Sequence, residues 1–208
     1  QYGFTDKAID KGTTRYLRIT DIKDNGSINL NNEAKYINPT EETKKQFLLK
    51  DKDIVIARSG SVGKSAFYKS NSYEEMIFAS YLIRLIVDNE KISSEYLFNF
   101  TKTKSYWSQV EVNSMAVTQP NLNAEKIKDF KIPLPPKEIQ SKIVSEIEKL
   151  EKQEGKAVES IEKLQIDISN TISNTKGKLT KLEDITSKIG SGSTPRGGKG
   201  SYQSSGIS

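Results

Sequence analysis

The chain has 208 residues, of which 34% are hydrophobic and 28% charged, so it can bury a core as one domain or two small ones. It contains no cysteine and no histidine, which excludes disulfides, thiolate nucleophiles, histidine-based triads and histidine–zinc sites. A net charge of +5 permits binding to a polyanion without requiring it. The absence of cysteine and of any apolar run long enough to cross a bilayer favours a cytoplasmic protein without a membrane partner.

Residues 1–132 have the pattern of a mixed domain of short strands and a few helices. Runs of β-branched and aromatic residues predict strands at 16–22, 54–57, 65–68 and 78–87. Asn38-Pro39-Thr40-Glu41 supplies the cap, first-turn proline and N3 glutamate of a helix that should run to about Leu49. A second helix should begin at Ser93 or Ser94 and carry Leu97, Phe100 and Trp107 on one side.

The stretch ARSGSVGKSAF at 57–67 contains GSVGKS, which superficially matches a phosphate-binding loop. Such a loop has four residues between its first glycine and Gly-Lys-Ser, but only two separate Gly60 from Gly63. The residues that follow favour a strand, whereas a helix N-terminus would have to face the phosphates. A glycine hairpin is therefore predicted, and its protruding turn would also suit contact with nucleic acid.

Residues 133–177 begin with a proline-rich break, Pro133-Leu134-Pro135-Pro136, and continue as the longest periodic stretch of the chain. A helix from Lys137 to Lys176 would be roughly 60 Å long at 1.5 Å per residue. A small domain cannot bury so long an apolar stripe, so a partner helix is expected, although Glu154 and Gly155 interrupt the seam. The residues expected in the helix interface are Ile139, Ile143, Ile147, Leu150, Ala157, Ile161, Leu164 and Ile168.

Residues 178–208 change character again. Leu179 to Ile189 has the pattern of a short amphipathic segment or strand, and a glycine-rich tail follows it. Gly192-Ser193-Thr194 echoes Gly3-Phe4-Thr5. This part is therefore expected either to begin a second copy of the first domain or to complete the first one.

Several blocks, taken in order, resemble the specificity (S) subunits of type I restriction-modification systems. They are RYLRITDI at 15–22, DIVIARSGSVGK at 53–64, FASYLIR at 78–84, QPNLN at 119–123, IPLPP at 132–136, EIQ at 138–140, and the long helix. The resemblance spans nearly the whole chain. In that family, two target-recognition domains are joined by two long antiparallel helices, and each domain reads half of a bipartite DNA sequence. This chain resembles half a subunit, truncated or circularly permuted, with one target-recognition domain.

The resemblance implies an α+β fold, in which a mixed α/β target-recognition domain precedes a long coiled-coil-forming helix. It implies a non-catalytic DNA reader that works with methyltransferase and restriction subunits. S-adenosylmethionine, ATP and Mg would then be held by those partners, with no cofactor in this chain. The lone apolar stripe of the helix predicts a homodimer, in which the helices of two chains replace the pair found within one subunit of the family. The alternative function is a coiled-coil scaffold or protein-interaction module without DNA specificity.

The candidate DNA contacts are polar side chains near turns, where arginine can pair with guanine and asparagine or glutamine with adenine. They are Arg15, Arg58, Ser59, Lys64, Thr118 and Gln119. Arg18 and Arg84 lie inside apolar strands and are expected to have structural roles. The chain contains no Asn-Pro-Pro-aromatic or Asp-Pro-Pro-aromatic methyltransferase motif.

Overall fold

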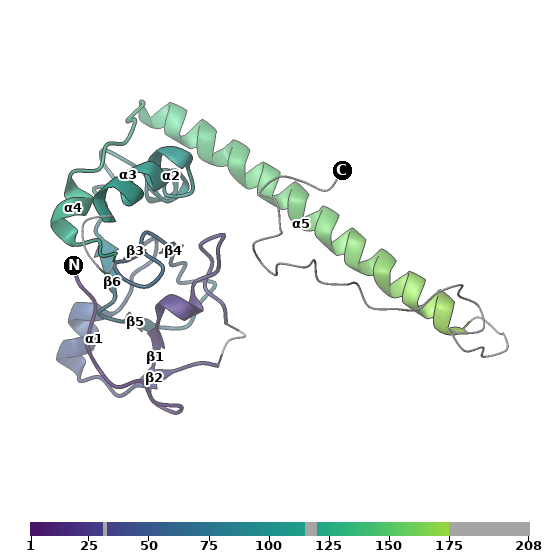
Figure 1. The fold of residues 1–208 in the computed structure, drawn as a ribbon, viewed down its shortest axis with the longest axis horizontal. Coiled ribbons are helices and arrows are strands. Elements are labelled where there is room, and N and C mark those ends of the chain that lie inside the picture. The colour runs from purple at the N-terminus through teal and green to yellow at the C-terminus, as the bar shows by residue number, and fades with distance from the viewer. Residues whose placement is uncertain (31–32, 115–119, 175–208) are drawn as a thin grey trace, which may run out of the picture. The chain divides into compact units, whose positions relative to one another are not determined.

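The computed structural model describes residues 1–30, 33–114 and 120–174 (Figure 1). The chain divides into two compact units, residues 1–154 and 155–208. The described residues form short strands, several helices and one long helix, so the predicted α+β class is confirmed. None of the helices in these ranges is both long enough and apolar enough to cross a membrane.

Two three-stranded sheets make up the centre of residues 1–154. In the first, β1 (Thr14–Leu17) lies between β2 (Tyr36–Ile37), which is antiparallel to it, and β5 (Met76–Phe78), which is parallel. In the second, β3 (Ile54–Ala57) lies between β4 (Ser65–Phe67) and β6 (Leu82–Leu85), and both pairings are antiparallel.

Strand β3 is buried on both faces and separates two apolar clusters. Its side chains alternate, because successive residues of a strand point to opposite faces. Val55 and Ala57 belong to a cluster with Leu17 and Phe78, whereas Ile54 and Ile56 pack with residues of the helices. A strand with two buried faces reads as a continuous apolar run, and this is why IVIA could be recognised from the sequence.

Two predicted strands are shorter than expected. The strand predicted at 16–22 ends at Leu17, because Ile19–Asp21 forms a 3-10 turn (η1) in which the Asp21 carboxylate accepts hydrogen bonds from Arg18. The strand predicted at 78–87 was wrong as a single element. It is split between β5 and β6, which belong to different sheets, by a turn in which the Leu82 amide donates to the Ala79 carbonyl (2.8 Å).

The short helices begin at capping side chains. Helix α1 (Glu41–Phe47) is capped by Thr40, so the prediction of Asn38 as its cap was wrong; the Asn38 side chain instead accepts a hydrogen bond from the Thr13 amide. Helix α2 (Ser94–Phe100) begins at Ser94, within the predicted start, and is capped by Ser93. Trp107 belongs to a separate helix, α3 (Lys104–Ser114), because the chain turns at 101–103. Asn123 caps α4 (Ala124–Lys128).

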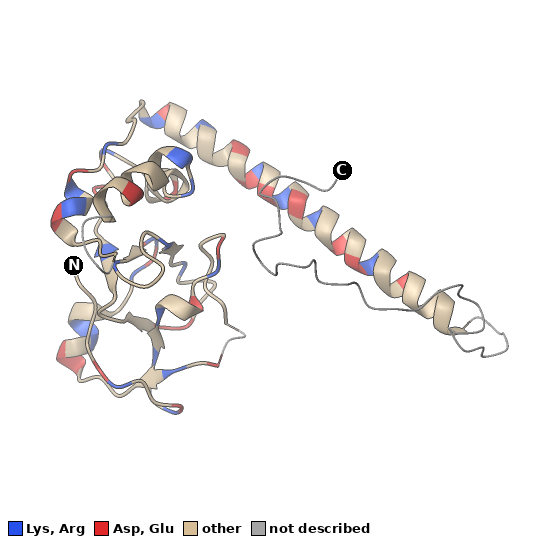
Figure 2. Ribbon diagram, in the orientation of Figure 1, with Lys and Arg blue, Asp and Glu red and all other residues tan. Residues whose placement is uncertain are grey.

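Helix α5 (Lys137–Asn174) is a single 38-residue helix, which confirms the long helix predicted from the apolar repeat. Its first turn is attached to the residues that precede it through Gln140, which is 1% exposed. The Gln140 side chain accepts a hydrogen bond from the Ser93 amide (2.9 Å) and donates to the carbonyls of Pro135 and Lys91. The helix continues through Glu154 and Gly155, where the sequence suggested an interruption. Acidic and basic residues are interspersed along it (Figure 2).

Candidate nucleic-acid interface

A polar groove of about 750 Å³ lies where several segments of the chain meet. The hairpin between β3 and β4, the turn between β5 and β6, and the segment before α4 all contribute to it. The residues lining it are Thr5, Arg58, Ser59, Gly60, Ser80, Tyr81, Pro120 and Asn121. The fold therefore gathers hydroxyls, an amide and a guanidinium from segments that are far apart in the sequence.

The glycines at the tip of the hairpin allow its tight turn. Gly60 and Gly63 have φ values of 67° and 84°, a region that other residues rarely adopt. Strands β3 and β4 pair antiparallel on either side of them, and the Gly63 amide donates to the Ala57 carbonyl (2.9 Å). A strand, not a helix, follows Gly63. The glycine hairpin is thus confirmed, and the arrangement of a phosphate-binding loop is absent from these residues.

Arg58 has a fixed backbone and an available side chain. Its amide donates to the Tyr81 carbonyl (2.9 Å), and its own carbonyl accepts from the Leu122 amide (2.8 Å). Its guanidinium carbon lies 4.8 Å from the centroid of the Tyr2 ring. Within the described ranges, the arginines that form ion pairs are Arg15, Arg18 and Arg84. The Arg58 cation is therefore free of carboxylate partners among these residues.

Lys64 and Arg15 are placed less favourably for contact with DNA. Lys64 pairs with Asp24 (2.8 Å), and that hydrogen bond lowers the pKa of the Asp24 carboxyl. Arg15 is 4% exposed inside β1, bonded to the Glu74 carboxylate (2.9 Å) and the Asn29 carbonyl (3.1 Å). Neither residue lines the polar groove. Their roles in DNA contact stay predictions.

Two further candidates, Thr118 and Gln119, lie outside the described residues. The residues that directly follow them, Pro120 and Asn121, line the groove. Asn121 belongs to the QPNLN block, but the sequence analysis predicted DNA contacts nearby only for Thr118 and Gln119. Tyr81, which is 62% exposed, was missed because its segment was predicted to be an uninterrupted strand.

The two arginines expected to be structural are bound within the fold. Arg84 is buried, and its guanidinium donates to the Asp53 carboxylate (3.3 Å) and to the Leu48 carbonyl (2.9 Å). Arg18 pairs with Asp21 at 2.9 Å. Both side chains thus have the structural roles that were expected, although Arg18 lies just beyond the end of β1 and its side chain is 26% exposed.

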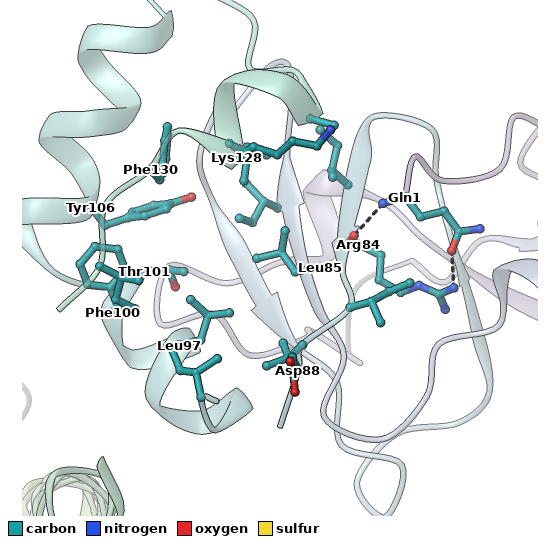
Figure 3. Close-up of a pocket in the computed structure, with 18 residues that line it drawn as sticks. Gln1, Arg84, Leu85, Asp88, Leu97, Phe100, Thr101, Tyr106, Lys128 and Phe130 are labelled. Atoms are coloured by element: carbon teal, nitrogen blue, oxygen red, sulfur yellow. Dashed lines mark hydrogen bonds between the residues drawn. The ribbon is translucent and has the colours of Figure 1, made fainter. Parts of the chain in front are cut away.

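A second hollow, of about 470 Å³, is apolar and lies between β6 and helices α2, α3 and α4 (Figure 3). Leu85, Leu97, Phe100 and Phe130 are among its lining residues. Tyr106, also in the lining, donates its hydroxyl proton to the Gly63 carbonyl (2.8 Å), and burial raises its pKa. Aliphatic and aromatic walls do not provide the donors that phosphates or base edges require, so nucleic-acid contact is better served by the polar groove.

The described residues contain no group of three or more acidic side chains placed to hold a metal ion.

Helix α5 presents a stripe of solvent-exposed apolar side chains. Exposed fractions are 42% for Ile139, 54% for Leu150, 55% for Ile161 and 60% for Leu164. Ile143, Ala157 and Ile168 are also exposed, and Ile147 is partly buried. A continuous exposed stripe of this kind is typical of a helix that packs against another helix.

Comparison with known proteins relates the chain to a known family. The family model described as "Type I restriction modification DNA specificity domain" matches residues 3–184. The type I restriction enzyme StySPI specificity subunit of Salmonella potsdam is 34% identical over 142 residues, which are 64% of this chain and 29% of that protein.

Solved structures support the same fold. The HsdS subunit from Thermoanaerobacter tengcongensis matches with a TM-score of 0.56 and 18% identity, over 82% of this chain and 44% of that chain. A structure described as the structural basis of complex assembly and conformational transition of the type I R-M system matches with the same values. The chain thus spans under a third of the curated relative and under half of each structure. Because the family model covers most of its length, the chain belongs to the family of type I restriction modification DNA specificity domains.

Proposed function

We propose that this chain is a non-catalytic DNA reader that recognises one half of a bipartite target of a type I restriction-modification complex. The observation that carries the proposal is the polar groove, which is lined by Arg58 of the hairpin between β3 and β4 together with Ser59, Tyr81 and Asn121. The family description, a DNA specificity domain, supports the same conclusion.

The side chains of the groove match the chemistry of base recognition. Arginine donates two parallel hydrogen bonds to guanine, and asparagine pairs with adenine through one donor and one acceptor. Arg58 and Asn121 would supply these contacts. Ser59 and Ser80 carry hydroxyls that can bond either to bases or to phosphate oxygens. Lysines elsewhere on the surface would add affinity that does not depend on the sequence.

The exposed stripe on α5 supports a homodimer in which two such helices pair. At 1.5 Å per residue, a 38-residue helix is about 57 Å long, enough to hold two recognition domains apart. A two-fold axis would make the two half-sites inverted copies of each other, because operator symmetry follows protein symmetry. The helix would then set the spacing between them.

The chemistry of the complex would be located in its other subunits. Methyltransferase subunits would bind S-adenosylmethionine, and a restriction subunit would use ATP and Mg for cleavage. This chain would bring them to the target, in agreement with relatives named as specificity subunits. A scaffold without DNA specificity is the less favoured alternative, because the family is described by its DNA specificity.

The proposal is tested by equilibrium binding of the 208-residue chain to fluorescent mixed-sequence duplexes over a series of salt concentrations. For the wild type, we expect log K to fall linearly with log salt, as phosphate contacts require. The double variant Arg58→Ala/Asn121→Ala should lose preference for the duplexes that the wild type binds most tightly. Lys102→Ala, in which the replaced lysine pairs with Glu151 and does not line the groove, is the matched control. Salt-independent or absent binding would reject the proposal.

A further inference from the structure

Tyr2 contacts Arg58 from outside the hairpin and is not itself part of the groove lining. We propose that Tyr2 is a positioning residue: its ring orients the Arg58 guanidinium for base recognition, and its hydroxyl fixes the chain segment that carries Asn121. This inference rests on the proposed function and goes further, because it assigns part of the base preference to a residue that need not touch DNA.

The ring of Tyr2 supplies the first contact. The guanidinium carbon of Arg58 lies 4.8 Å from its centroid, within the range of a cation–π interaction. Arg58 has no ion pair with a described residue, so the ring is the partner that the structure gives its charged end. A long side chain that stacks on a ring loses fewer rotamers on binding than a free one, which favours a single docking geometry.

The hydroxyl of Tyr2 supplies the second contact. It accepts a hydrogen bond from the Ala124 amide (3.1 Å), one of the first amides of α4, which has no partner within the helix. Asn121 lies three residues before this point and lines the groove. Between Asn121 and Ala124 in the sequence, the Leu122 amide donates a hydrogen bond to the Arg58 carbonyl (2.8 Å). One tyrosine therefore connects the arginine and the asparagine of the groove.

The backbone of Tyr2 is itself held firmly. Tyr2 pairs with Ile83 of β6, and the Gly3 amide donates to the Leu82 carbonyl (3.1 Å). A Cβ atom at Gly3 would lie 2.2 Å from the Ala79 carbonyl oxygen, so only glycine allows the chain to approach the turn between β5 and β6 this closely. The ring is thus supported by the same turn that presents Ser80 and Tyr81.

The two contacts can be removed separately. Tyr2→Phe keeps the ring and removes the hydroxyl, whereas Tyr2→Leu removes both. Since a cation–π contact at an exposed site changes an equilibrium by about two- to fivefold, Tyr2→Leu should reduce base discrimination by about that factor. Tyr2→Phe should keep the preference at the position that Arg58 reads. Its effect should be confined to the position read by Asn121.

The experiment is a double-mutant cycle on discrimination, measured as the affinity ratio between duplexes enriched by the wild-type chain from a randomised library and single-base variants of them. At the position that Arg58 reads, we expect Tyr2→Leu to lower the ratio in the wild type and to change nothing further in an Arg58→Ala background. At the position that Asn121 reads, the loss of the hydroxyl should have the same effect in both backgrounds. Affinity for an unselected duplex should change less than twofold, since no phosphate contact is removed. Lys102→Ala, which removes a cation 4.6 Å from the Phe98 ring away from the groove, should leave the ratio unchanged.

The outcomes separate the two proposals. If Arg58→Ala leaves discrimination at the wild-type value, the groove is not the reading site and the role of Tyr2 fails with it. If Arg58→Ala lowers discrimination but, at the position that Arg58 reads, Tyr2→Leu has no effect or has the same effect in both backgrounds, only the positioning role is overturned. Urea unfolding of each variant identifies a stability change, and Tyr2→Gln, which keeps a polar side chain but no ring, must reproduce Tyr2→Leu.

Discussion

Alanine at Gly63 should destabilise the recognition domain far more than alanine at Gly60, although both glycines lie in the same hairpin. Both have positive φ, and each substitution costs about 1 kcal/mol for a left-handed backbone. At Gly60 the nearest atom to a new Cβ is 3.8 Å away. At Gly63 the Cβ would lie 2.7 Å from Val110 Cγ1, and overpacking of this kind adds about 1–3 kcal/mol. We expect about 1 kcal/mol for Gly60→Ala and about 2–4 kcal/mol for Gly63→Ala.

The assay is urea unfolding followed by the fluorescence of Trp107, the one tryptophan of the chain, which lies beside Gly63. The clash has a direct control, because Val110→Ala should cost less in the Gly63→Ala protein than in the wild type. A coupling of about 1 kcal/mol or more is expected between residues in contact. Equal losses for the two glycine variants, or strictly additive effects of Gly63 and Val110, would refute the packing of α3 against the hairpin described above.

Three further outcomes follow from single contacts. Arg84→Met should lower the free energy of unfolding by about 3 kcal/mol in the same assay, because it leaves the nearly buried Asp53 carboxylate without its ion-pair partner. A decrease under about 1 kcal/mol would contradict this. Ile161→Asp with Leu164→Asp should convert a dimer to a monomer in sedimentation at unchanged stability of residues 1–154, whereas a wild type that sediments as a monomer would reject helix pairing. Asp24→Asn releases Lys64, and should steepen the slope of log K against log salt by about 0.9 if the freed cation reaches a phosphate; an unchanged slope would place Lys64 away from DNA.

Local signals allowed part of the fold to be predicted. Strand β3 is a run of four buried apolar residues, and Gly60 and Gly63 mark the turn after it, so both could be recognised within a short window. The long helix was equally clear, because apolar residues recur at helical spacing from Ile139 to Ile168, on both sides of Glu154 and Gly155. These features depend on neighbouring residues, which a single sequence displays directly.

Non-local contacts explain what was missed. Ser80-Tyr81 contains neither glycine nor proline, and its turn exists because β5 and β6 join different sheets. Arg15 looked like a surface contact, but its carboxylate partner is 59 residues away. The groove brings together Thr5, Arg58 and Asn121 from three distant segments. Nothing in a local pattern indicates which polar residues will meet in this way.

Selection of duplexes from a randomised library by the 208-residue chain tests the central claim most directly. We expect enrichment of a short motif, present as two inverted copies at a fixed spacing, with preference at one position of each copy lost in Arg58→Ala. A selected pool that is indistinguishable from the input, or a motif that survives Arg58→Ala and Asn121→Ala unchanged, would contradict DNA reading through this groove.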